Sequence, residues 1–241
     1  MKLSGNAMSN LKKNKKKGNK GRWLGIIFIG IVVVGIGIVV FTLFNVPSPK
    51  KLSSGDYPQS SQIFDRNGEL LYEIYAEKRR LPVKLEEVPD SLKKATLAIE
   101  DANFYRHGGF DIRGLIRGLY RTVVEKRLQG GSTLTQQLVK NTFLTPEKTL
   151  SRKVKELILA IELENKYSKD ETLGFYLNQI PYGYNAYGIE AASRTYFGKS
   201  AKDLDLAESA LLASLPRRPS YYNAHPDELK IRQEYILDRM V

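Results

Sequence analysis

The sequence of 241 residues contains no cysteine and only two histidines, His107 and His225. The absence of cysteine excludes disulfides, thiolate metal ligands and a cysteine nucleophile. Two isolated histidines argue against a zinc site, because such sites are built mainly from cysteine and grouped histidine. The length allows one core of ordinary size plus an appendage, but not two large domains.

Acidic residues are absent from the first 22 positions, which hold eight of the 38 lysines and arginines. The remaining 30 basic residues are nearly balanced by 26 acidic ones, although the formal net charge of the whole chain is +12. The strongly basic feature is therefore a tail, and the rest is a mildly basic globular domain. This distribution argues against a nucleic-acid-binding protein.

An apolar run follows the tail from Leu24 to Phe44, interrupted only by glycines and one threonine. About 20 apolar residues can cross a bilayer as a helix. We therefore predict a basic tail at 1–22 and one transmembrane helix at 23–45, with Trp23 at the interface. The lysines place the tail in the cytoplasm and the rest outside. The alternative, a buried core helix, does not account for the lysine block.

Residues 46–61 are rich in proline, serine and glycine, which predicts a linker to a globular domain at 62–241. Asn67-Gly68 between two apolar segments predicts a β-hairpin over 63–75. Helical spacing dominates the remainder, so the fold class is mainly α with a short N-terminal hairpin. The expected helices are 91–99, 112–128, 133–143, 150–164, 169–180, 206–215 and 226–241, the last of which ends without a cap and is compatible with a truncated longer protein.

Glu100 and Asp101 end the first of these helices, with Phe104 and His107 just beyond. A carboxylate at the end of an apolar helix suits a general acid or base. The alternative is an ordinary solvated Glu-Asp pair at a helix terminus, and this cluster alone favours that alternative.

Residues 130–137, GGSTLTQQ, lead two glycines into a helix whose Thr133 and Gln136 fit a capping box. The free N–H groups of such a helix start can bind an oxyanion such as phosphate. Lys140 falls on the same helix face as Thr133 and Gln136. A well-capped structural helix explains the pattern equally well.

A third cluster combines Lys148, Arg152, Lys153 and Lys155 with Glu156. It predicts a basic wall for a pyrophosphate, with one carboxylate held among the cations. The alternative is a weak surface salt bridge between Arg152 and Glu156, one helical turn apart.

In this order, the three clusters resemble the peptidoglycan glycosyltransferases of family 51, found in class A penicillin-binding proteins and monofunctional transglycosylases. Two further motifs of that family lie toward the C-terminus, and five motifs in order are a specific signal. They are E-D-x-x-F-x-x-H-x-G at 100–109, G-x-S-T-x-T-Q-Q at 130–137, R-K-x-x-E at 152–156, K-x-x-I-L-x-x-Y-x-N at 169–178 with Thr172 for isoleucine, and R-x-x-x-V-L-x-x-M at 232–240 with Ile236 for valine.

The resemblance implies a lysozyme-like, two-lobed domain that polymerises lipid II into β-1,4-linked glycan strands. Glu100 would be the general base and Glu156 the second catalytic carboxylate. Undecaprenyl pyrophosphate would leave with inversion at the donor sugar. The implied substrate-binding residues are Asp101, Phe104, His107, Ser132, Thr133, Gln136, Gln137, Lys140, Lys148, Arg152, Lys153, Lys155, Tyr176 and Asn178.

The implied partners are lipid II, the growing glycan strand, the membrane and other wall-synthesis and division proteins, with no nucleic acid. The implied location is the cell membrane, with the catalytic domain outside. A need for magnesium or manganese varies in the family and stays open. So does the choice between a monofunctional enzyme and the N-terminal part of a class A protein.

Two other functions compete with this one. A lysozyme-like enzyme that cleaves peptidoglycan would also use one glutamate, but it needs no basic wall for a pyrophosphate. A non-catalytic membrane scaffold of the wall-synthesis machinery would need neither Glu100 nor Glu156.

Overall fold

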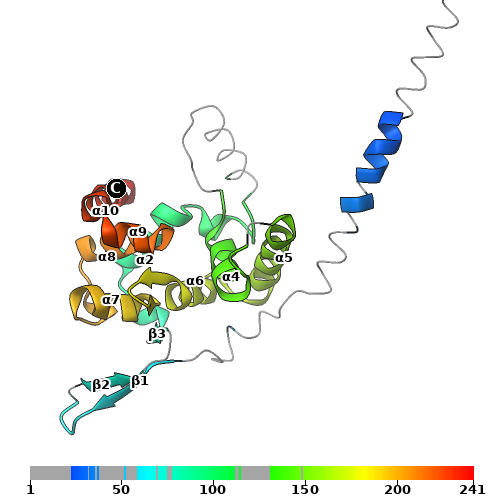
Figure 1. Cartoon of the computed structure of the whole chain (residues 1–241). Coiled ribbons are helices and arrows are strands. Elements are labelled where there is room, and N and C mark those ends of the chain that lie inside the picture. Colours follow the sequence, from blue (N-terminus) through cyan, green and yellow to red (C-terminus); the bar gives the residue numbers. More distant parts are fainter. Residues whose placement is uncertain are drawn as a thin grey trace, which may run out of the picture. The chain divides into compact units, whose positions relative to one another are not determined.

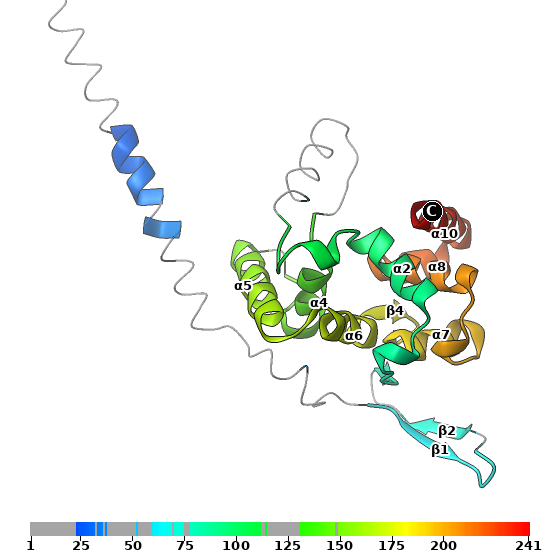
Figure 2. The same ribbon diagram turned by 180° about the vertical axis from the view of Figure 1, so that it is seen from behind.

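The structure is a computed structural model, shown in Figure 1 and from behind in Figure 2. It describes residues 23–31, 33–35, 37, 52, 59–68, 70–74, 78–111, 114, 131–147 and 149–241. The chain divides into two compact units, Met1–Val46 and Pro47–Val241, which are considered separately.

The first unit is helical at residues 23–31, 33–35 and 37. Its apolar side chains, such as Trp23 and Ile31, are well over half exposed. None of the helices in the described part of the chain has the length and hydropathy needed to cross a membrane. The predicted span at 23–45 lies partly outside the described residues and stays a prediction.

The second unit is mainly helical with two small sheets, as the sequence predicts. The elements are β1 (Ser61–Phe64), β2 (Leu70–Ile74), β3 (Arg79–Arg80), η2 (Leu85–Glu87), α2 (Asp90–Glu100), η3 (Phe104–Arg106), α4 (Leu134–Phe143), α5 (Leu150–Lys166), α6 (Lys169–Gln179), β4 (Pro181–Gly183), β5 (Ala186–Tyr187), α7 (Ile189–Phe197), η4 (Ala201–Asp203), α8 (Leu206–Ser214), η5 (Leu215–Arg217), α9 (Pro219–Ala224) and α10 (Pro226–Met240). Six of the helices, α2, α4, α5, α6, α8 and α10, begin at or next to the predicted positions. Four of them, α4, α5, α6 and α8, have side-chain caps that are readable in the sequence.

Side-chain caps set the start of several helices. Thr133 accepts a hydrogen bond from Gln136 N at the start of α4, and Ser168 forms a full capping box with Glu171 at the start of α6. The predicted helix at 112–128 lies almost wholly outside the described residues. Helices α7 and α9 were not predicted from the sequence.

The predicted hairpin is confirmed as the antiparallel pair β1–β2. Asn67 N donates to Asp65 Oδ1 at 2.8 Å, and Gly68 adopts a φ of 84°, which a side chain would disfavour. Most of the predicted linker lies outside the described residues, and its last residue, Ser61, begins β1.

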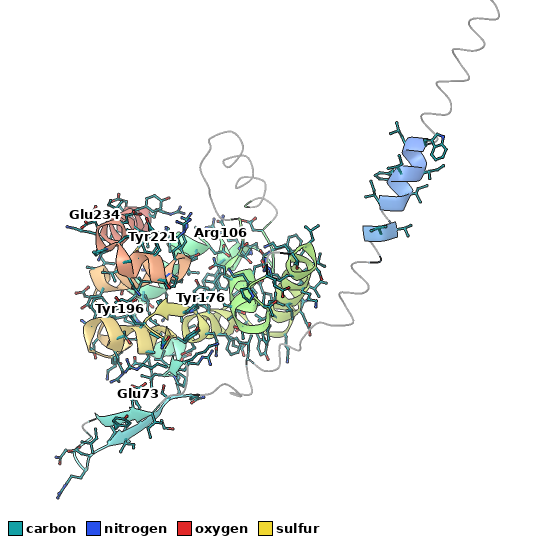
Figure 3. The ribbon with its side chains drawn as sticks, in the orientation of Figure 1. Glu73, Arg106, Tyr176, Tyr196, Tyr221 and Glu234 are labelled. Carbon is teal, nitrogen blue, oxygen red and sulfur yellow. The ribbon has the colours of Figure 1, made fainter. Side chains whose placement is uncertain are left out.

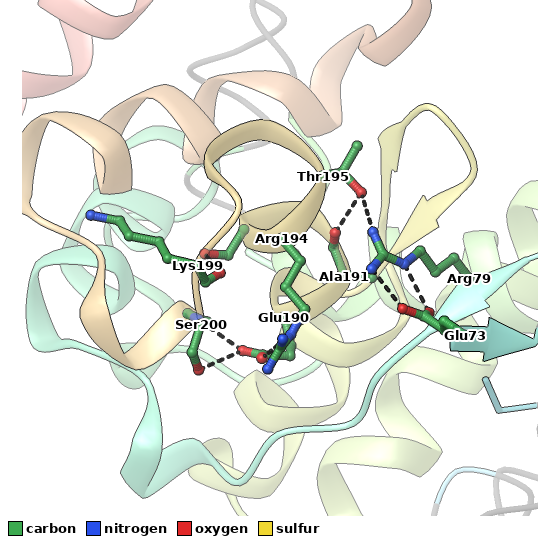
Figure 4. A network of polar contacts seen from close by, with 10 residues as sticks. Glu73, Arg79, Glu190, Ala191, Arg194, Thr195, Lys199 and Ser200 are labelled. Atoms are coloured by element: carbon green, nitrogen blue, oxygen red, sulfur yellow. Dashed lines mark hydrogen bonds and ion pairs between the residues drawn. The ribbon is translucent and has the colours of Figure 1, made fainter. Parts of the chain in front are cut away.

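Arg79 ties the hairpin to the helical body (Figure 4). Its Nε and Nη2 donate to the two carboxylate oxygens of Glu73 in β2 at 2.8 and 2.6 Å. Its Nη1 donates to Thr195 Oγ1 in α7 at 2.9 Å. The hydrogen bond from Arg79 lowers the pKa of Glu73 despite its partial burial. Such a two-pronged contact fixes the direction of the hairpin as well as its position.

The second sheet has the order β3-β5-β4. Strand β3 runs parallel to β5 and pairs Arg79 with Ala186, whereas β4 and β5 form an antiparallel hairpin. Tyr184 and Asn185 in its turn have positive φ values of 46° and 58°, the conformation of a tight hairpin turn. This sheet therefore joins β3, near residue 80, to the β4–β5 hairpin, about 100 residues later in the sequence.

Two groups of helices form the core (Figures 1 and 2). In one, α2, α8 and α10 pack together around Ala95, Ala210, Ala213 and Ile236. The three alanines leave room for the helix axes to approach closely. In the other, α4 packs against α5 and α6, and the buried leucines come from all three helices. Fully buried examples are Leu138, Leu159, Leu163, Leu173 and Leu177.

Candidate active site

Glu100 is the last residue of α2, and its side chain is only 10% exposed. Gln137 in α4 donates from Nε2 to Glu100 Oε2 at 2.7 Å. Arg232 in α10 places Nη2 at 3.8 Å from Glu100 Oε1. Among the described residues, no group donates a hydrogen bond to Oε1. Glu100 is therefore fixed through one carboxylate oxygen, while its other oxygen is buried beside Arg232 and accepts no hydrogen bond from the described residues.

Two buried tyrosines lie near this carboxylate, Tyr176 in α6 and Tyr182 in β4. Burial, and then the charge of Glu100, raise the pKa of both tyrosines far above the ordinary value of 10. Both phenols are therefore neutral at physiological pH. Tyr176 lies inside the domain (Figure 3) and is fully buried. It therefore interacts with Glu100 from within the core.

Asp101 links the first and second sequence clusters. Its Oδ1 lies 2.8 Å from His107 Nε2, and its Oδ2 accepts a hydrogen bond from Leu134 N at 3.0 Å. Leu134 is the first residue of α4, where a negative charge interacts favourably with the helix dipole. Asp101 thus fixes the start of α4 beside Glu100.

His107 is held from both sides. Its Nδ1 lies 2.6 Å from the Gly108 carbonyl oxygen. Burial acts to lower the pKa of His107, but the hydrogen bonds to Asp101 and Gly108 outweigh it and raise that pKa above the ordinary value of 6.5. Phe104 packs edge-on against His107 and is 1% exposed. The Lys169 ammonium lies 4.3 Å from the centre of the Phe104 ring.

Glu156 on α5 is 2% exposed and is paired with two cations. Arg152 donates from Nη1 at 2.6 Å, and Lys153 Nζ contacts the other carboxylate oxygen. Lys153 also donates to Ser132 Oγ at 3.1 Å and to Gln136 Oε1 at 3.4 Å. The predicted basic cluster is therefore joined directly to the start of α4.

The first turn of α4 connects the two carboxylates. Gln137 contacts Glu100, whereas its neighbour Gln136 contacts Lys153, the partner of Glu156. Thr133, which caps the helix, also donates to the Gly109 carbonyl oxygen at 3.3 Å. This turn therefore gathers all three sequence clusters into one site.

The remaining predicted site residues are placed less directly. Lys140 is exposed on α4, and Lys155 is half-buried on α5. Asn178 bonds both the amide and the carbonyl of Val83, and also the Gly174 carbonyl, so its side chain is occupied within the fold. Lys148 lies outside the described residues.

Two neighbours of Glu100 were not assigned a role from the sequence. Arg232 falls in the fifth motif, which indicates membership of a family but gives no partner. Tyr182 lies in the sequence Pro181-Tyr182-Gly183-Tyr184, whose residue spacing does not indicate a functional motif. Both reach Glu100 only through tertiary packing.

The described residues contain no group of three or more His, Asp or Glu side chains arranged to hold a metal ion. A cavity of about 410 Å³ lies elsewhere, between β1, η2 and α7, and includes Leu81, Glu190 and Lys202 in its lining. None of the predicted site residues lines it.

Comparison with known proteins identifies several relatives. The family model described as Transglycosylase matches residues 67–241. Penicillin-binding protein 1F of Bacillus subtilis is 44% identical over 213 residues, covering 87% of this chain and 29% of that protein. Penicillin-binding protein 1A of Aquifex aeolicus is 42% identical over 224 residues, covering 90% of this chain and 31% of that protein.

Among solved structures, penicillin-binding protein 1A from Haemophilus influenzae is similar over 77% of this chain and 18% of that chain. The sequence identity is 27% and the TM-score is 0.37. The chain spans about a third of the length of the curated relatives it matches.

Proposed function

Because this chain belongs to the transglycosylase family, we propose that residues 62–241 form a peptidoglycan glycosyltransferase that polymerises lipid II. The observation that carries the proposal is the buried Glu100 carboxylate, fixed by Gln137 and joined through α4 to a cationic cluster. A general base and a site for a phosphate leaving group are what this reaction needs.

Glu100 acts as the general base in the proposed mechanism. It takes the proton from the 4-hydroxyl of the acceptor GlcNAc as that oxygen attacks C1 of the donor MurNAc. The new C1–O bond forms as the bond from C1 to the pyrophosphate oxygen breaks, and the electron pair leaves on undecaprenyl pyrophosphate. Attack from the opposite face inverts C1 and gives the β-1,4 linkage.

The cationic cluster stabilises the leaving group. Pyrophosphate leaves as an anion, so it requires neutralisation of charge rather than a proton donor. Arg152 and Lys153 share one carboxylate, Glu156, which leaves a net positive charge at the start of α4. The N–H groups of Leu134 and Gln136 at that helix start already donate to Asp101 and Thr133, so the proposed stabilisation comes from the cations. Lys140, Lys148 and Lys155 are proposed to add further positive charge.

Glu156 is proposed to orient these cations. It binds Arg152 and Lys153 through separate oxygens, so both side chains are held before substrate arrives. Preorganised charge costs no rearrangement when the leaving group departs. Both oxygens of Glu156 pair with these cations, so a magnesium or manganese ion could bind there only if Arg152 or Lys153 moved away.

Membrane attachment follows from the substrate, because both lipid II molecules carry lipid tails. We propose that residues 23–45 span the cell membrane, with the basic tail in the cytoplasm and a lysozyme-like, two-lobed domain outside. The growing glycan strand and other wall-synthesis proteins are the proposed partners. A chain that continues beyond Val241, as in its longer relatives, would add further activities.

The test is incubation of the purified full chain with labelled lipid II in detergent. Glu100→Gln keeps the acceptor for Gln137 but removes the base, and Glu234→Gln is the matched control on the exposed surface of α10 (Figure 3). We expect polymer from the wild type and the control, and a loss of about 10²–10⁴-fold in rate for Glu100→Gln.

Other outcomes would point to the competing functions. Cleavage of preformed glycan strands, with lipid II left intact, would replace the transferase with a hydrolase. The contacts of Arg152 and Lys153 with Glu156, and of Lys153 with Ser132, favour the transferase, because a hydrolase releases no anionic pyrophosphate. If neither substrate changed, a scaffold role would be the better account.

A further inference from the structure

Arg232 enters the site from α10, the last helix of the chain. Ile236 lies one turn further along α10 and packs with Ala95 of α2 and Ala213 of α8. This packing holds α10 against α2 and directs Arg232 to the end of α2, where Glu100 lies. The position of Arg232 therefore depends on helix packing far from it in sequence.

The side chain of Arg232 is 10% exposed and contacts Ser214, Tyr222 and Glu100. Its Nε donates to the Ser214 carbonyl oxygen at 3.1 Å, and its guanidinium lies 5.9 Å from the centre of the Tyr222 ring. Its Nη2 faces Glu100 Oε1 at 3.8 Å. Burial lowers the pKa of Arg232, and nearby Arg217 acts in the same direction, whereas Tyr222 and Glu100 oppose the change.

A buried cation and a buried carboxylate each carry a large desolvation cost unless they compensate one another. In the described part of the chain, Glu100 is the carboxylate within ion-pair distance of Arg232. Three neutral groups also interact with Glu100, namely Gln137 from α4, Tyr176 from α6 and Tyr182 from β4. The charge of Glu100 is therefore balanced from α10.

The two oxygens of Glu100 are held differently. Oε2 accepts a 2.7 Å hydrogen bond from Gln137. Oε1 faces Arg232 at 3.8 Å, which is within ion-pair distance but too long for a hydrogen bond. The cation thus attracts Oε1, which is buried, through charge alone and without a hydrogen bond.

We propose that Arg232 is a positioning residue for the glycosyl transfer, and that its charge holds the carboxylate of Glu100 in the orientation from which it takes the acceptor proton. The proposal rests on the proposed function, because it assumes that Glu100 is the base. Arg232 acts through Glu100 and Ser214 and does not contact lipid II. Its loss should therefore slow the chemical step and leave substrate binding intact.

The test measures kcat and KM for lipid II polymerisation by the full chain in detergent. Arg232→Met removes the positive charge and the hydrogen bond from Nε to Ser214, whereas Arg232→Lys keeps a positive charge near Glu100. Arg239→Met is the matched control, because Arg239 is an exposed arginine on the same helix. Thermal unfolding of each variant checks the fold, and Arg232→Gln replaces Arg232→Met if the methionine variant does not fold.

We expect Arg232→Met to lower kcat on the order of 10²-fold, the effect of displacing a reacting group by about 1 Å. KM should change by less than about threefold, because ground-state binding is intact. Arg232→Lys should recover part of kcat, and Arg239→Met should match the wild type.

Three results would overturn the proposal. One is wild-type kcat in Arg232→Met, and another is an equal loss in the lysine and methionine variants. The third is a rise in KM at unchanged kcat, which would place Arg232 on the substrate. A wild type that forms no polymer would instead refute the proposed function, and this inference with it.

Discussion

Gly109 is a position at which even the smallest side chain should be destabilising. A Cβ built on Gly109 would lie 2.7 Å from Ala160 C, Ala160 O and Ile161 N, all backbone atoms of α5. A Cβ on its neighbour Gly108 would meet nothing within 4 Å. Neither glycine has a positive φ. Gly109→Ala and Gly108→Ala therefore differ only in the contact with α5.

Overpacking of this kind costs about 1–3 kcal/mol. We expect the upper half of that range for Gly109→Ala, because a helix backbone yields less than the end of a side chain. About 2–3 kcal/mol should lower the Tm of a domain of this size by roughly 4–12 °C. Gly108→Ala should be neutral or stabilising by up to about 1 kcal/mol, since alanine restricts the unfolded chain.

The strain should also reach the active site, because the Gly109 carbonyl accepts the hydrogen bond from Thr133 at the start of α4. Circular dichroism of the full chain in detergent gives the two Tm values, and lipid II polymerisation gives the rates. Equal Tm values for the two variants would refute the reasoning, because they would show that the loop does not pack against α5 as described.

Two further predictions concern side chains that the motifs single out. Asn178→Asp should lower the free energy of unfolding by about 1–3 kcal/mol, because a carboxylate cannot donate to the Val83 and Gly174 carbonyls. Denaturant unfolding measures this loss, with Asn141→Asp as an exposed control. An equal free energy of unfolding in the two variants would contradict the prediction. The raised pKa of His107 stabilises the folded state fully below the ordinary value, and this contribution is lost as pH rises through the raised pKa. The stability difference between wild type and His107→Gln should therefore be larger at about pH 5.5 than at about pH 8.5, and a difference independent of pH would exclude this role.

Much of the helical framework was predictable, because its signals are local. Thr133 and Ser168 mark helix starts through caps that involve residues only three positions away. Helix α7 was missed because it begins after Gly188, which provides no side-chain cap. The β3–β5 pair was missed because strands of two residues have no periodicity and their partners are far apart in sequence.

The sequence predicted which residues form the site better than it predicted the contacts between them. The motifs named Glu100, Glu156 and the cations around them. They did not indicate that Asp101 would bond to the amide at the start of α4, or that Asn178 would be occupied by Val83. Contacts of this kind depend on how helices pack, and a pattern of residue types along one chain does not contain that geometry.

The surroundings of Glu100 also depend on segments that leave the ribosome at different times. The residues around Glu100 come from α2, α4, α6, β4 and α10. In the second sheet, β3 can pair only after β5 has been synthesised. Such long-range pairings form late in folding, because loop-closure entropy opposes them until much of the chain is in place. A ribosome releases α10 only after α2, α4 and α6. A nascent chain that stops before α10 therefore already carries the glutamate while lacking the arginine that balances its charge.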